Sequence, residues 1–564
     1  MIDSFGIMEF PFNEGITSNA QRSIPSQLLL YPVVYILYCP KTALAYIGES
    51  TNILNRLKQH LQNADKSKLK HVQIITSLFF HKSAVLDIEA NLIQNIQADG
   101  KYKLLNGNEG IANHLYYEKE RYNNIFTGIW EKLKLEKVVN NDLLSLKNSD
   151  LFKYSPYKTL SNSQLGAIAH LMTALNDENS SQSLIVEGGA GTGKTVLAVY
   201  LIKLLLSEFD PDEEIDNPEL IPIINLCKNY RKNLGFKDFK VALIIPVASL
   251  RSTIQRVFST VKGLSRKMVL SPIDLANAYR DGIEYDLVIV DEAHRLRRRQ
   301  GLTNYKSFDD SNKVFGYDEE GDEIDWIQRA SKQKIYFYDA KQSIRPSDIA
   351  RSRFDELKSQ STIVELKTQL RIRGGEEYIY FVDQLLSTSD MLEKYDSKDY
   401  DLKHFKSIKS LVKALEEKER EFGLCRLTSG YSWEWVSKSD ATMPDLTLEG
   451  IDFFWNKTSV DWVSSTNSVT EMGCIHTTQG YDLNYAGIIF GKEIDFNEKT
   501  NSIEIIRSNY KDKKGDIKRI PEEDIHEYIV NIYNTLMCRG ILGTYIYCYN
   551  EALREYFKKY IPTI

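Results

Sequence analysis

Eight consecutive residues, Gly188-Gly189-Ala190-Gly191-Thr192-Gly193-Lys194-Thr195, constrain the fold of this chain more than any other segment. They lie between a short apolar run, Leu184–Val186, and a longer apolar run that begins at Val196. This order predicts a strand, a glycine-rich loop and a helix, whose backbone N–H groups face one anion. Gly188, Gly191 and Gly193 let the loop wrap a phosphate, Lys194 reaches the β- and γ-phosphates, and Thr195 binds Mg²⁺. We therefore expect hydrolysis of ATP or GTP, with ATP as the cofactor.

From Leu160 onward, short apolar runs alternate with helical patterns, which predicts parallel sheets covered by helices. A chain of 564 residues is too long for one core, and three or four domains are expected. Two acidic stretches, Asp210–Asn217 and Asp309–Glu323, are predicted to be solvated loops. The predicted division is an N-terminal extension over 1–30, a compact α/β domain over 31–110, a helical connector over 111–158, a first lobe over 159–360 and a second lobe with inserts over 361–564.

The overall charge limits the partners of the chain. With 71 basic and 77 acidic residues the net charge is −6, so any nucleic-acid surface must be a local groove. The six cysteines are scattered, which argues against a zinc site or a disulfide framework and fits a reducing cytosol. There is no signal-like N-terminus and no apolar run of about 20 residues. We expect a cytoplasmic protein with no membrane partner.

A second motif, which is acidic, supports the prediction of a nucleotide site. Tyr285–Val290 reads as a buried strand that delivers Asp291 and Glu292 to its carboxyl end, where α/β sheets bind ligands. Asp291 would complete the Mg²⁺ shell begun by Thr195, and Glu292 would polarise the attacking water. An acidic pair after a strand is also a common helix cap. Its pairing with the upstream glycine loop favours the catalytic interpretation.

Further polar residues follow at intervals along the chain. Gln164 could read adenine, Gln342 could sense the γ-phosphate, and Arg371 or Arg539 could stabilise charge on the transferring phosphoryl group. Any one of these arginines, taken alone, is more often part of a surface salt bridge. The remaining segment of interest is His476–Asp482, which contains Gly480.

In this order the segments resemble the motifs of superfamily 1 helicases. Three stretches are similar to the Schlafen group 3-type DNA/RNA helicase domain: Asp291–Arg299, Ser429–Trp435 and Cys474–Leu483. The resemblance covers about residues 158–550 and implies two RecA-like parallel-sheet lobes that hydrolyse ATP on nucleic acid. One departure is Gln479-Gly480-Tyr481-Asp482, where superfamily relatives often have Lys-Gly-Leu-Glu.

Some basic and aromatic residues keep two interpretations. Four arginines after the acidic motif either contact a phosphate backbone or form a solvated face; these are Arg295, Arg297, Arg298 and Arg299. The basic loop Arg507–Arg519 is equally open. Three tryptophans, Trp433, Trp435 and Trp455, either stack on bases or pack in the core.

The N-terminal domain carries a separate pattern. Val33–Tyr38 and Ala45–Gly48 predict a hairpin, and an amphipathic helix begins near Leu54. A later helix presents an apolar face on which Glu89 lies. Because glutamate is rarely buried alone, Glu89 is predicted to be a buried ion-pair member or a metal ligand.

These residues resemble the GIY-YIG nuclease superfamily. Val33-Val34-Tyr35 stands in place of the first motif, with Val33 for its glycine, and Tyr46-Ile47-Gly48 matches the second unchanged. The other matching positions are Arg56, Glu89 and Asn106. The resemblance covers about residues 31–110 and implies a metal-dependent endonuclease.

The resemblance also implies roles for these residues. Glu89 would bind Mg²⁺ or Mn²⁺, and Arg56 would clamp the scissile phosphate. Tyr35 or Tyr46 would activate water, which requires nearby positive charge to lower a tyrosine pKa near 10. Asn106 is favoured as a structural residue. His60 could assist proton transfer, but a position on the helix surface is favoured.

The predicted function is that of an ATP-dependent nuclease–helicase that acts on nucleic acid. DNA is favoured over RNA as its substrate. Fusions of this kind resemble bacterial systems against phage, and an oligomer or accessory proteins fit such a role. Two alternatives remain: an ATPase switch that senses nucleic acid and whose N-terminal unit only binds DNA, and an RNA-directed nuclease–helicase.

Overall fold

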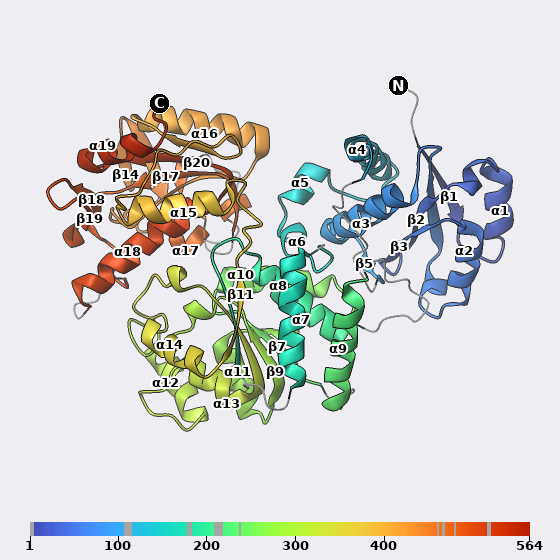
Figure 1. Cartoon of the computed structure of the whole chain (residues 1–564), viewed down its shortest axis with the longest axis horizontal. Helices are drawn as coiled ribbons and strands as arrows, with labels where there is room; N and C mark the ends of the chain where they lie inside the picture. Colours follow the sequence, from blue (N-terminus) through green and yellow to red (C-terminus); the bar gives the residue numbers. More distant parts are fainter. Residues whose placement is uncertain are drawn as a thin grey trace. The chain divides into compact units, whose positions relative to one another are not determined.

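The computed structural model describes residues 5–106, 116–158, 160–177, 183–207, 218–235, 239–458, 462–464, 469–478, 481–515 and 520–564 (Figure 1). Internal contacts divide the chain into two compact units. Unit 1 comprises residues 1–176, 196–238 and 253–269, and unit 2 comprises 177–195, 239–252 and 270–564. Within the described ranges, no helix is long and apolar enough to cross a membrane.

Unit 1 contains a five-stranded sheet in the order β1-β4-β2-β3-β5. The antiparallel pair β2–β3 is the predicted hairpin, with Tyr35 opposite Gly48 in its register. Every residue of β2 is buried, so this strand forms the centre of the core. The strands are β1 (Gly6–Pro11), β2 (Val33–Cys39), β3 (Leu44–Ser50), β4 (His71–Thr76) and β5 (Lys103–Leu104).

Helices pack around this sheet and beyond it. α3 contacts β2, β3 and the three helices that follow it, and it ends where Gly100 adopts a left-handed φ of 70°. α7 packs against α9 within the same unit. The helices are α1 (Ile16–Ser23), α2 (Ile53–Gln62), α3 (Lys82–Asp99), α4 (Lys119–Leu135), α5 (Leu143–Lys147), α6 (Asp150–Lys153), α7 (Asn162–Asn176) and α9 (Leu220–Asn233).

Two helices have residues in both units. α8 (Lys194–Leu206) begins at the glycine-rich loop in unit 2, and its residues from 196 onward belong to unit 1. α10 (Ala248–Ser259) likewise passes from unit 2 into unit 1 at residue 253. Compact units in this chain are therefore not continuous stretches of sequence.

Unit 2 contains a six-stranded sheet in the order β11-β6-β10-β9-β7-β8. The pairings β11–β6, β6–β10, β10–β9 and β9–β7 are all parallel, as predicted. Its strands are β6 (Ser183–Gly188), β7 (Val241–Ile244), β8 (Val269–Leu270), β9 (Tyr285–Val290), β10 (Ser331–Tyr338) and β11 (Thr362–Leu366). The accompanying helices are α11 (Pro272–Arg280), α12 (Tyr305–Val314), α13 (Glu323–Ala330) and α14 (Arg351–Ser359).

One predicted loop in this lobe is correct at its centre and wrong at its ends, since residues 315–322 connect α12 and α13 with Glu319 and Glu320 exposed. Asp309 lies in the middle of α12, and Glu323 at the other end of the stretch is fully buried. Glu323 forms an ion pair of 2.7 Å with Arg297, which explains how its charge is tolerated inside the lobe. The other predicted acidic loop, Asp210–Asn217, lies outside the described residues.

A second parallel sheet, in the order β12-β20-β17-β13, completes unit 2. Helices cover both of its faces (Figure 1), and the two parallel sheets confirm the predicted pair of RecA-like lobes. The strands are β12 (Asp401–His404), β13 (Cys425–Ser429), β17 (Leu483–Phe490) and β20 (Gly540–Cys548), and the helices are α15 (Gly375–Leu386), α16 (Ile408–Phe422), α17 (Ile475–Thr478), α18 (Glu522–Met537) and α19 (Glu551–Tyr560). The inserts are β14 (Leu446–Leu448), β15 (Ile451–Trp455), β16 (Glu471–Met472), β18 (Ile494–Asn497) and β19 (Ser502–Ile505).

Candidate functional sites

Tyr35 forms the centre of the candidate site in unit 1. Its ring is fully buried in β2, and its hydroxyl oxygen lies 2.7 Å from Nε2 of His60 on α2. Across the hairpin, a Cβ on Gly48 would lie 2.3 Å from the same hydroxyl oxygen. Only glycine therefore fits at position 48, and the last residue of the motif Tyr46-Ile47-Gly48 is dictated by the place of the Tyr35 hydroxyl.

Cations and rings surround this hydroxyl. The ring of Tyr46 lies 6.4 Å from the Tyr35 ring and 5.1 Å from the His60 ring. Lys66 places its Nζ 4.0 Å from the centre of the Tyr46 ring, a cation–π contact. Burial lowers the pKa of the Arg56 guanidinium. The charge interactions and hydrogen bonds with Tyr35 and Tyr46 outweigh this effect, so the pKa of Arg56 lies above its usual value. Tyr35, Tyr46 and Arg56 are thus brought together as predicted.

The charge state of Tyr35 differs from the prediction. Burial raises the pKa of Tyr35 well above its usual value, Arg56 opposes this only in part, and Glu89 and Glu49 raise it further. The expected net lowering by positive charge is therefore wrong for the protein without ligands, because loss of hydration outweighs one guanidinium. Tyr35 is protonated near neutral pH, and its hydroxyl forms a hydrogen bond with Nε2 of His60.

His60 belongs to this site and not to the helix surface, so that expectation is wrong. It is 2% exposed, and burial, Lys66 and Arg56 lower its pKa to about 3. Its neutral imidazole can accept the Tyr35 proton at Nε2. The spacing of Arg56 and His60, four residues apart in one helix, places both on one face and was the signal available in the sequence.

Glu89 and Asn106 complete the predicted set in different ways. Glu89 is buried on α3, and its charge acts on Tyr35. Asn106 accepts a hydrogen bond from the Ile47 N–H at 3.1 Å and donates one to the Ile47 carbonyl at 2.8 Å. The side chain of Asn106 thus contacts the backbone between Tyr46 and Gly48, which favours a structural role.

The unit 1 site offers oxygen to a metal. Among the described residues, no cluster of three His, Cys, Asp or Glu side chains forms a metal site. A divalent ion would therefore take one carboxylate, Glu89, and complete its shell with water and phosphate oxygens. Hard cations such as Mg²⁺ and Mn²⁺ accept such a donor set.

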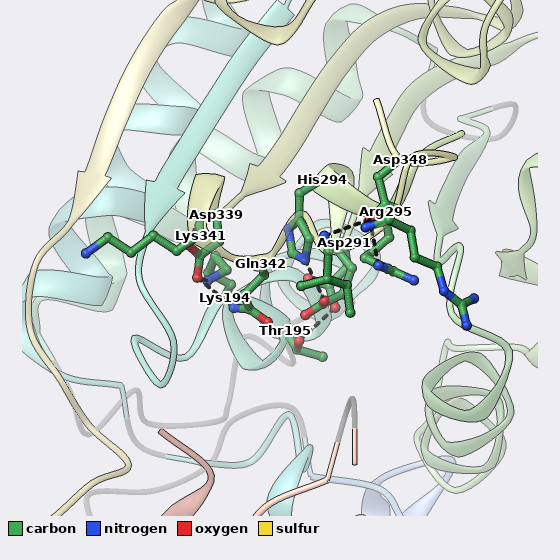
Figure 2. A network of polar contacts seen from close by, with 12 residues as sticks. Lys194, Thr195, Asp291, His294, Arg295, Asp339, Lys341, Gln342 and Asp348 are labelled. Carbon is green, nitrogen blue, oxygen red and sulfur yellow. Dashed lines mark hydrogen bonds and ion pairs between the residues drawn. The ribbon is translucent and has the colours of Figure 1, made fainter. Parts of the chain in front are cut away.

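The glycine-rich loop of unit 2 forms the second site (Figure 2). Lys194 donates hydrogen bonds from Nζ to the carbonyls of Gly188 at 2.7 Å and Gly189 at 2.9 Å, and it lies 3.3 Å from Asp339 Oδ2. Gly191 and Gly193 adopt left-handed φ values of 81° and 82°, so the loop requires them. Loop and lysine form one closed hydrogen-bonded cradle.

Thr195 and Asp291 meet at this site, as predicted. Thr195 donates from Oγ1 to Asp291 Oδ2 at 2.7 Å, while Asp291 Oδ1 is buried without a hydrogen-bond partner among the described residues. Burial and the charge of Glu292 raise the pKa of Asp291 to about 7. A buried carboxylate oxygen beside a hydroxyl is a donor set that fits Mg²⁺.

Glu292 follows in a strained backbone conformation, with a φ of 54°. Its carboxylate pairs with His294 at 3.0 Å. Burial raises the pKa of Glu292, but His294, Lys194 and Arg539 lower it to about 2, so the carboxylate stays ionised. His294 is a member of this site that the predicted residue set left out, although it follows directly in Asp291–His294.

Neighbouring residues close the cradle from the other side. Gln342 donates from Nε2 to Asp339 Oδ2 at 2.6 Å and so shares an acceptor with Lys194. Leu370 donates its N–H to the Gly191 carbonyl at 3.1 Å. A Cβ on Gly191 would lie 2.2 Å from Gln369 Oε1, so this glycine also permits the close approach of residue 369.

The two predicted arginines differ in their partners. Arg371 is held by Asp482 Oδ1 at 2.9 Å and by the Cys538 carbonyl at 2.6 Å. Arg539 is buried, and its charge acts on Glu292. Arg539 is therefore the arginine that the structure brings to the acidic motif.

Gln164 and Gly480 are the two remaining predicted residues. Gln164 is in unit 1, at the start of α7, where its Oε1 accepts a hydrogen bond from the Ser161 N–H at 3.1 Å. Gly480 lies outside the described residues.

A family model described as "Schlafen group 3, DNA/RNA helicase domain" matches residues 181–550. The chain belongs to this Schlafen group 3 helicase family. A second model, the "GIY-YIG catalytic domain", matches residues 31–103. The chain is therefore an enzyme with an endonuclease domain of GIY-YIG type and an ATPase/helicase domain of Schlafen group 3 type.

Individual relatives are more distant. A Saccharomyces cerevisiae protein named uncharacterized protein YPL245W is 25% identical over 421 residues, which cover 66% of this chain and 82% of that protein. The Pif1 helicase from Bacteroides in complex with ADP-AlF3 and ssDNA is 12% identical, covers 72% of this chain and 95% of its own, and gives a TM-score of 0.27. Mss116p bound to ssRNA and AMP-PNP is 12% identical, with 74% of each chain covered and a TM-score of 0.33.

Within the Schlafen helicase domain, three of the four arginines that follow the acidic motif have acidic partners, and Arg298 donates to the Pro346 carbonyl at 2.9 Å. Arg295 pairs with Asp348 at 2.7 Å, and Arg299 pairs with Asp309 at 2.7 Å. Together with the Arg297–Glu323 pair, these contacts favour a structural role for the cluster. The basic loop from Arg507 is described only to residue 515.

The three tryptophans Trp433, Trp435 and Trp455 have different environments in the structure. Trp455 is buried, and Trp433 packs against Tyr549 with ring centres 6.3 Å apart. Trp435 is 40% exposed, and Lys438 Nζ lies 5.2 Å from its ring centre. Trp435 is the exposed one of the three, and a cation lies over its ring.

Proposed function

We propose that the chain is an ATP-dependent nuclease–helicase that cleaves phosphodiester bonds in DNA. The observation that carries the proposal is the pair of assembled sites. The GIY-YIG domain gathers Tyr35, His60, Arg56 and Glu89, and the helicase domain gathers Lys194, Thr195 and Asp291. Each set holds the groups that its own chemistry needs.

At the nuclease site, the residues of the chain divide the work. His60 accepts the proton of Tyr35, so that the Tyr35 oxygen can take a proton from the attacking water. Arg56 binds the scissile phosphate through its planar guanidinium. Glu89 would hold a divalent cation, which supplies positive charge to the leaving oxygen and favours the ionised form of Tyr35. The phosphate anion in turn favours protonation of His60.

At the ATPase site, Lys194 exchanges its carbonyl partners for the phosphates of ATP. Thr195 and Asp291 would hold Mg²⁺, which supplies charge to the phosphate oxygens. Glu292 is ionised and orients the attacking water. Gln342 and Arg539 approach the γ-phosphate from the two lobes, and Arg371 keeps the place of Arg539 through the Cys538 carbonyl. Gln164 and Gly480 stay predictions, as adenine and loop contacts respectively.

Nucleic acid is the proposed substrate of both sites. The family description includes DNA and RNA, and the Pif1 and Mss116p structures hold ssDNA and ssRNA respectively. Trp435 is proposed to stack on a base of the bound strand. A role in bacterial defence against phage, a cytoplasmic location and an oligomer or accessory partner belong to the same proposal and are supported by the resemblance of such fusions.

A second candidate is a nucleic-acid-sensing ATPase whose N-terminal unit only binds DNA. The raised pKa of Tyr35 favours it, because a protonated tyrosine is a poor base. An RNA-directed enzyme is the third candidate, and its substrate differs only in the 2′-hydroxyl.

Two substitutions test the proposal. Glu89→Ala should abolish strand cleavage and leave ATP hydrolysis intact, whereas Lys194→Ala should abolish ATP hydrolysis. Cleavage and hydrolysis are measured on single-stranded, duplex and forked DNA and RNA, with Mg²⁺, Mn²⁺ or EDTA. Cleavage that survives in a well-folded Glu89→Ala protein would contradict the nuclease assignment. Wild-type protein that hydrolyses ATP but cuts no substrate would support the sensing ATPase.

A further inference from the structure

The strand that carries the nuclease motif is tied to the glycine-loop helix by a short series of buried contacts. We propose that Lys203 and Tyr157 are positioning residues that transmit the nucleotide state of the ATPase site along α8 to β3 of the nuclease domain. This inference rests on the proposed function.

The first link is α8 itself. It begins with Lys194 and Thr195, the residues that face the nucleotide, and Lys203 lies nine residues further along. At 1.5 Å per residue, this places Lys203 about 14 Å along the helix axis. Residues 197–205 are apolar apart from Lys203, and almost all of them are fully buried. A helix that is packed on all sides moves as one body with its neighbours.

The second link is a cation held on an aromatic ring. Lys203 is 2% exposed, and its Nζ lies 4.1 Å from the centre of the Tyr157 ring, which is itself buried. Removal of a lysine from water strengthens a cation–π contact. The place of Lys203 therefore fixes the place of the Tyr157 ring within unit 1.

The third link leads from Tyr157 to the motif. The Tyr157 hydroxyl donates to the Asn106 carbonyl at 3.4 Å. β5 pairs with β3 only at Leu44 and Ala45, and the Asn106 carboxamide continues that ladder by bonding both the N–H and the carbonyl of Ile47. Ile47 stands between Tyr46 and Gly48. A movement of Asn106 therefore shifts the two residues that enclose the Tyr35 hydroxyl.

A separate contact supports the same direction of coupling. The segment after α10 enters unit 1, where Thr260 Oγ1 accepts a hydrogen bond from Gln97 Nε2 at 2.9 Å. Gln97 lies on α3, two turns after Glu89. Val261 forms a parallel bridge with Leu104 of β5. The segment that follows α10 thus contacts α3, which carries Glu89, and β5, which directly precedes the segment that contains Asn106.

Hydrogen–deuterium exchange of the full-length protein tests the inference without relying on cleavage. The exchange rate of the peptide that contains Ile47 is measured without nucleotide and with Mg²⁺ and AMP-PNP. In the wild type we expect a change of about fivefold or more, the lower end of coupling between distant sites. Lys203→Met removes the charge and keeps the length of the side chain, and Tyr157→Phe removes the hydroxyl and keeps the ring. Both should lose the nucleotide-dependent change.

Two controls make the result specific. Lys418 lies over the rings of Phe422 and Tyr485 at 5.2 and 5.1 Å in unit 2, so Lys418→Met removes a comparable contact and should keep the change. Nucleotide affinity and nucleotide-free cleavage are measured for every variant and should stay within about twofold of wild type. A nucleotide-dependent change that persists in Lys203→Met and Tyr157→Phe overturns the inference, as does its absence from a wild type that binds AMP-PNP. Failure of the wild type to bind AMP-PNP would instead contradict the proposed ATPase, and the inference with it.

Discussion

The hydrogen bond between Tyr35 and His60 joins two groups whose proton affinities differ widely. Tyr35 holds its proton tightly and His60 is neutral, so the pair acts only when substrate charges favour the transfer. We expect His60→Ala to lower the rate of cleavage by about 10²- to 10⁴-fold, the usual contribution of one positioned acid–base group. Tyr35→Phe should cost as much, and the double variant little more, because the two residues act as one unit. Single-turnover cleavage measures all three.

His71 offers the matched control for that experiment. It lies in the same domain and bonds Glu9 at 2.8 Å on the exposed side of β4. His71→Ala should leave cleavage unchanged. Equal loss from His60→Ala and His71→Ala would show that removing a histidine merely weakens the domain.

Glu493 predicts a pH dependence of stability. It is fully buried, accepts a hydrogen bond from Tyr533 at 2.8 Å, and has its pKa raised by burial from 4.5 to about 7. Between these two pH values the unfolded chain loses this proton while the folded chain keeps it, so stability falls as pH rises from 4.5 to 7. Above pH 7 the cost is constant, at roughly 3 kcal/mol.

Glu493→Gln should therefore stabilise the protein at pH 8 and change little at pH 4.5. The amide keeps an acceptor for the Tyr533 hydroxyl and carries no charge. Calorimetric melting at the two pH values measures the difference. Glu498→Gln, at an exposed position nearby, should show no such trend.

At the residue scale, the sequence predicted best those site residues that follow a predicted strand. Thr195 and Asp291 were predictable because the glycine-rich loop before Thr195 and the segment that begins with Asp291 both follow parallel strands, whose carboxyl ends meet at one sheet edge. The charge state of Tyr35 was not, because it depends on how completely β2 is buried. His60 was misplaced because a helix face turns inward or outward according to packing that the helix sequence alone leaves open.

At the scale of elements, hydrogen bonds to the Asp445 carboxylate hold the segment after β13 in place. Asp445 accepts hydrogen bonds from the N–H groups of Ser437 and Trp455, both at 2.7 Å, and so fixes the loop between them. Trp435 lies two residues before Ser437, and its indole N–H donates to Ser437 Oγ at 3.2 Å while its ring stays exposed. Since one base–aromatic stack contributes about 1–3 kcal/mol, Trp435→Ala should weaken binding of single-stranded DNA roughly 5- to 150-fold.

Fluorescence anisotropy with a labelled oligo-dT strand measures this change. Trp435→Phe keeps a ring and should retain most of the affinity. Met443 is 51% exposed in the same insert, so Met443→Ala tests whether any apolar contact suffices. Equal weakening by Met443→Ala and Trp435→Ala would argue against base stacking.

Alternating apolar runs predicted both parallel sheets, because strands buried on both faces carry a strong signal. The two ends of the stretch from Asp309 to Glu323 were misread because their acidic composition resembles that of a loop. Arg297, Arg299 and Arg353 neutralise much of that charge, and the last of these pairs with Asp322 at 3.1 Å. Partners distant in sequence therefore decided the structure of this element.

At the scale of the whole chain, contacts and chain order divide the molecule differently. The predicted boundaries near 110 and 158 follow the motifs and stay predictions. Contacts place 196–238 and 253–269 with the N-terminal residues. No local pattern could show this, because an apolar helix such as α8 carries the same sequence whichever unit covers it.

This grouping predicts that the nuclease domain and the helicase domain do not fold independently when the chain is cut after residue 158. The cut would remove from unit 1 the contacts Gln97–Thr260, Leu104–Val261, Asp65–Lys262 at 2.8 Å and Asp150–Arg256 at 3.1 Å, together with Tyr157–Lys203. Fragment 1–158 should therefore melt at a lower temperature than unit 1 does in the intact chain. Its exposed apolar surface should bind a hydrophobic dye.

Co-expression separates a shared core from a simple linker. If unit 1 is one cooperative body, fragments 1–158 and 159–564 should co-purify and regain the melting temperature of the intact chain, since the lost contacts re-form without the peptide bond. The exposed ion pairs Asp65–Lys262 and Asp150–Arg256 contribute little, so high salt should leave the complex intact. Buried contacts such as Leu104 with Val261 should hold it together. Fragments that stay apart, each as stable as in the intact chain, would instead show that the nuclease is an independent domain and that α8 has no structural path to β3.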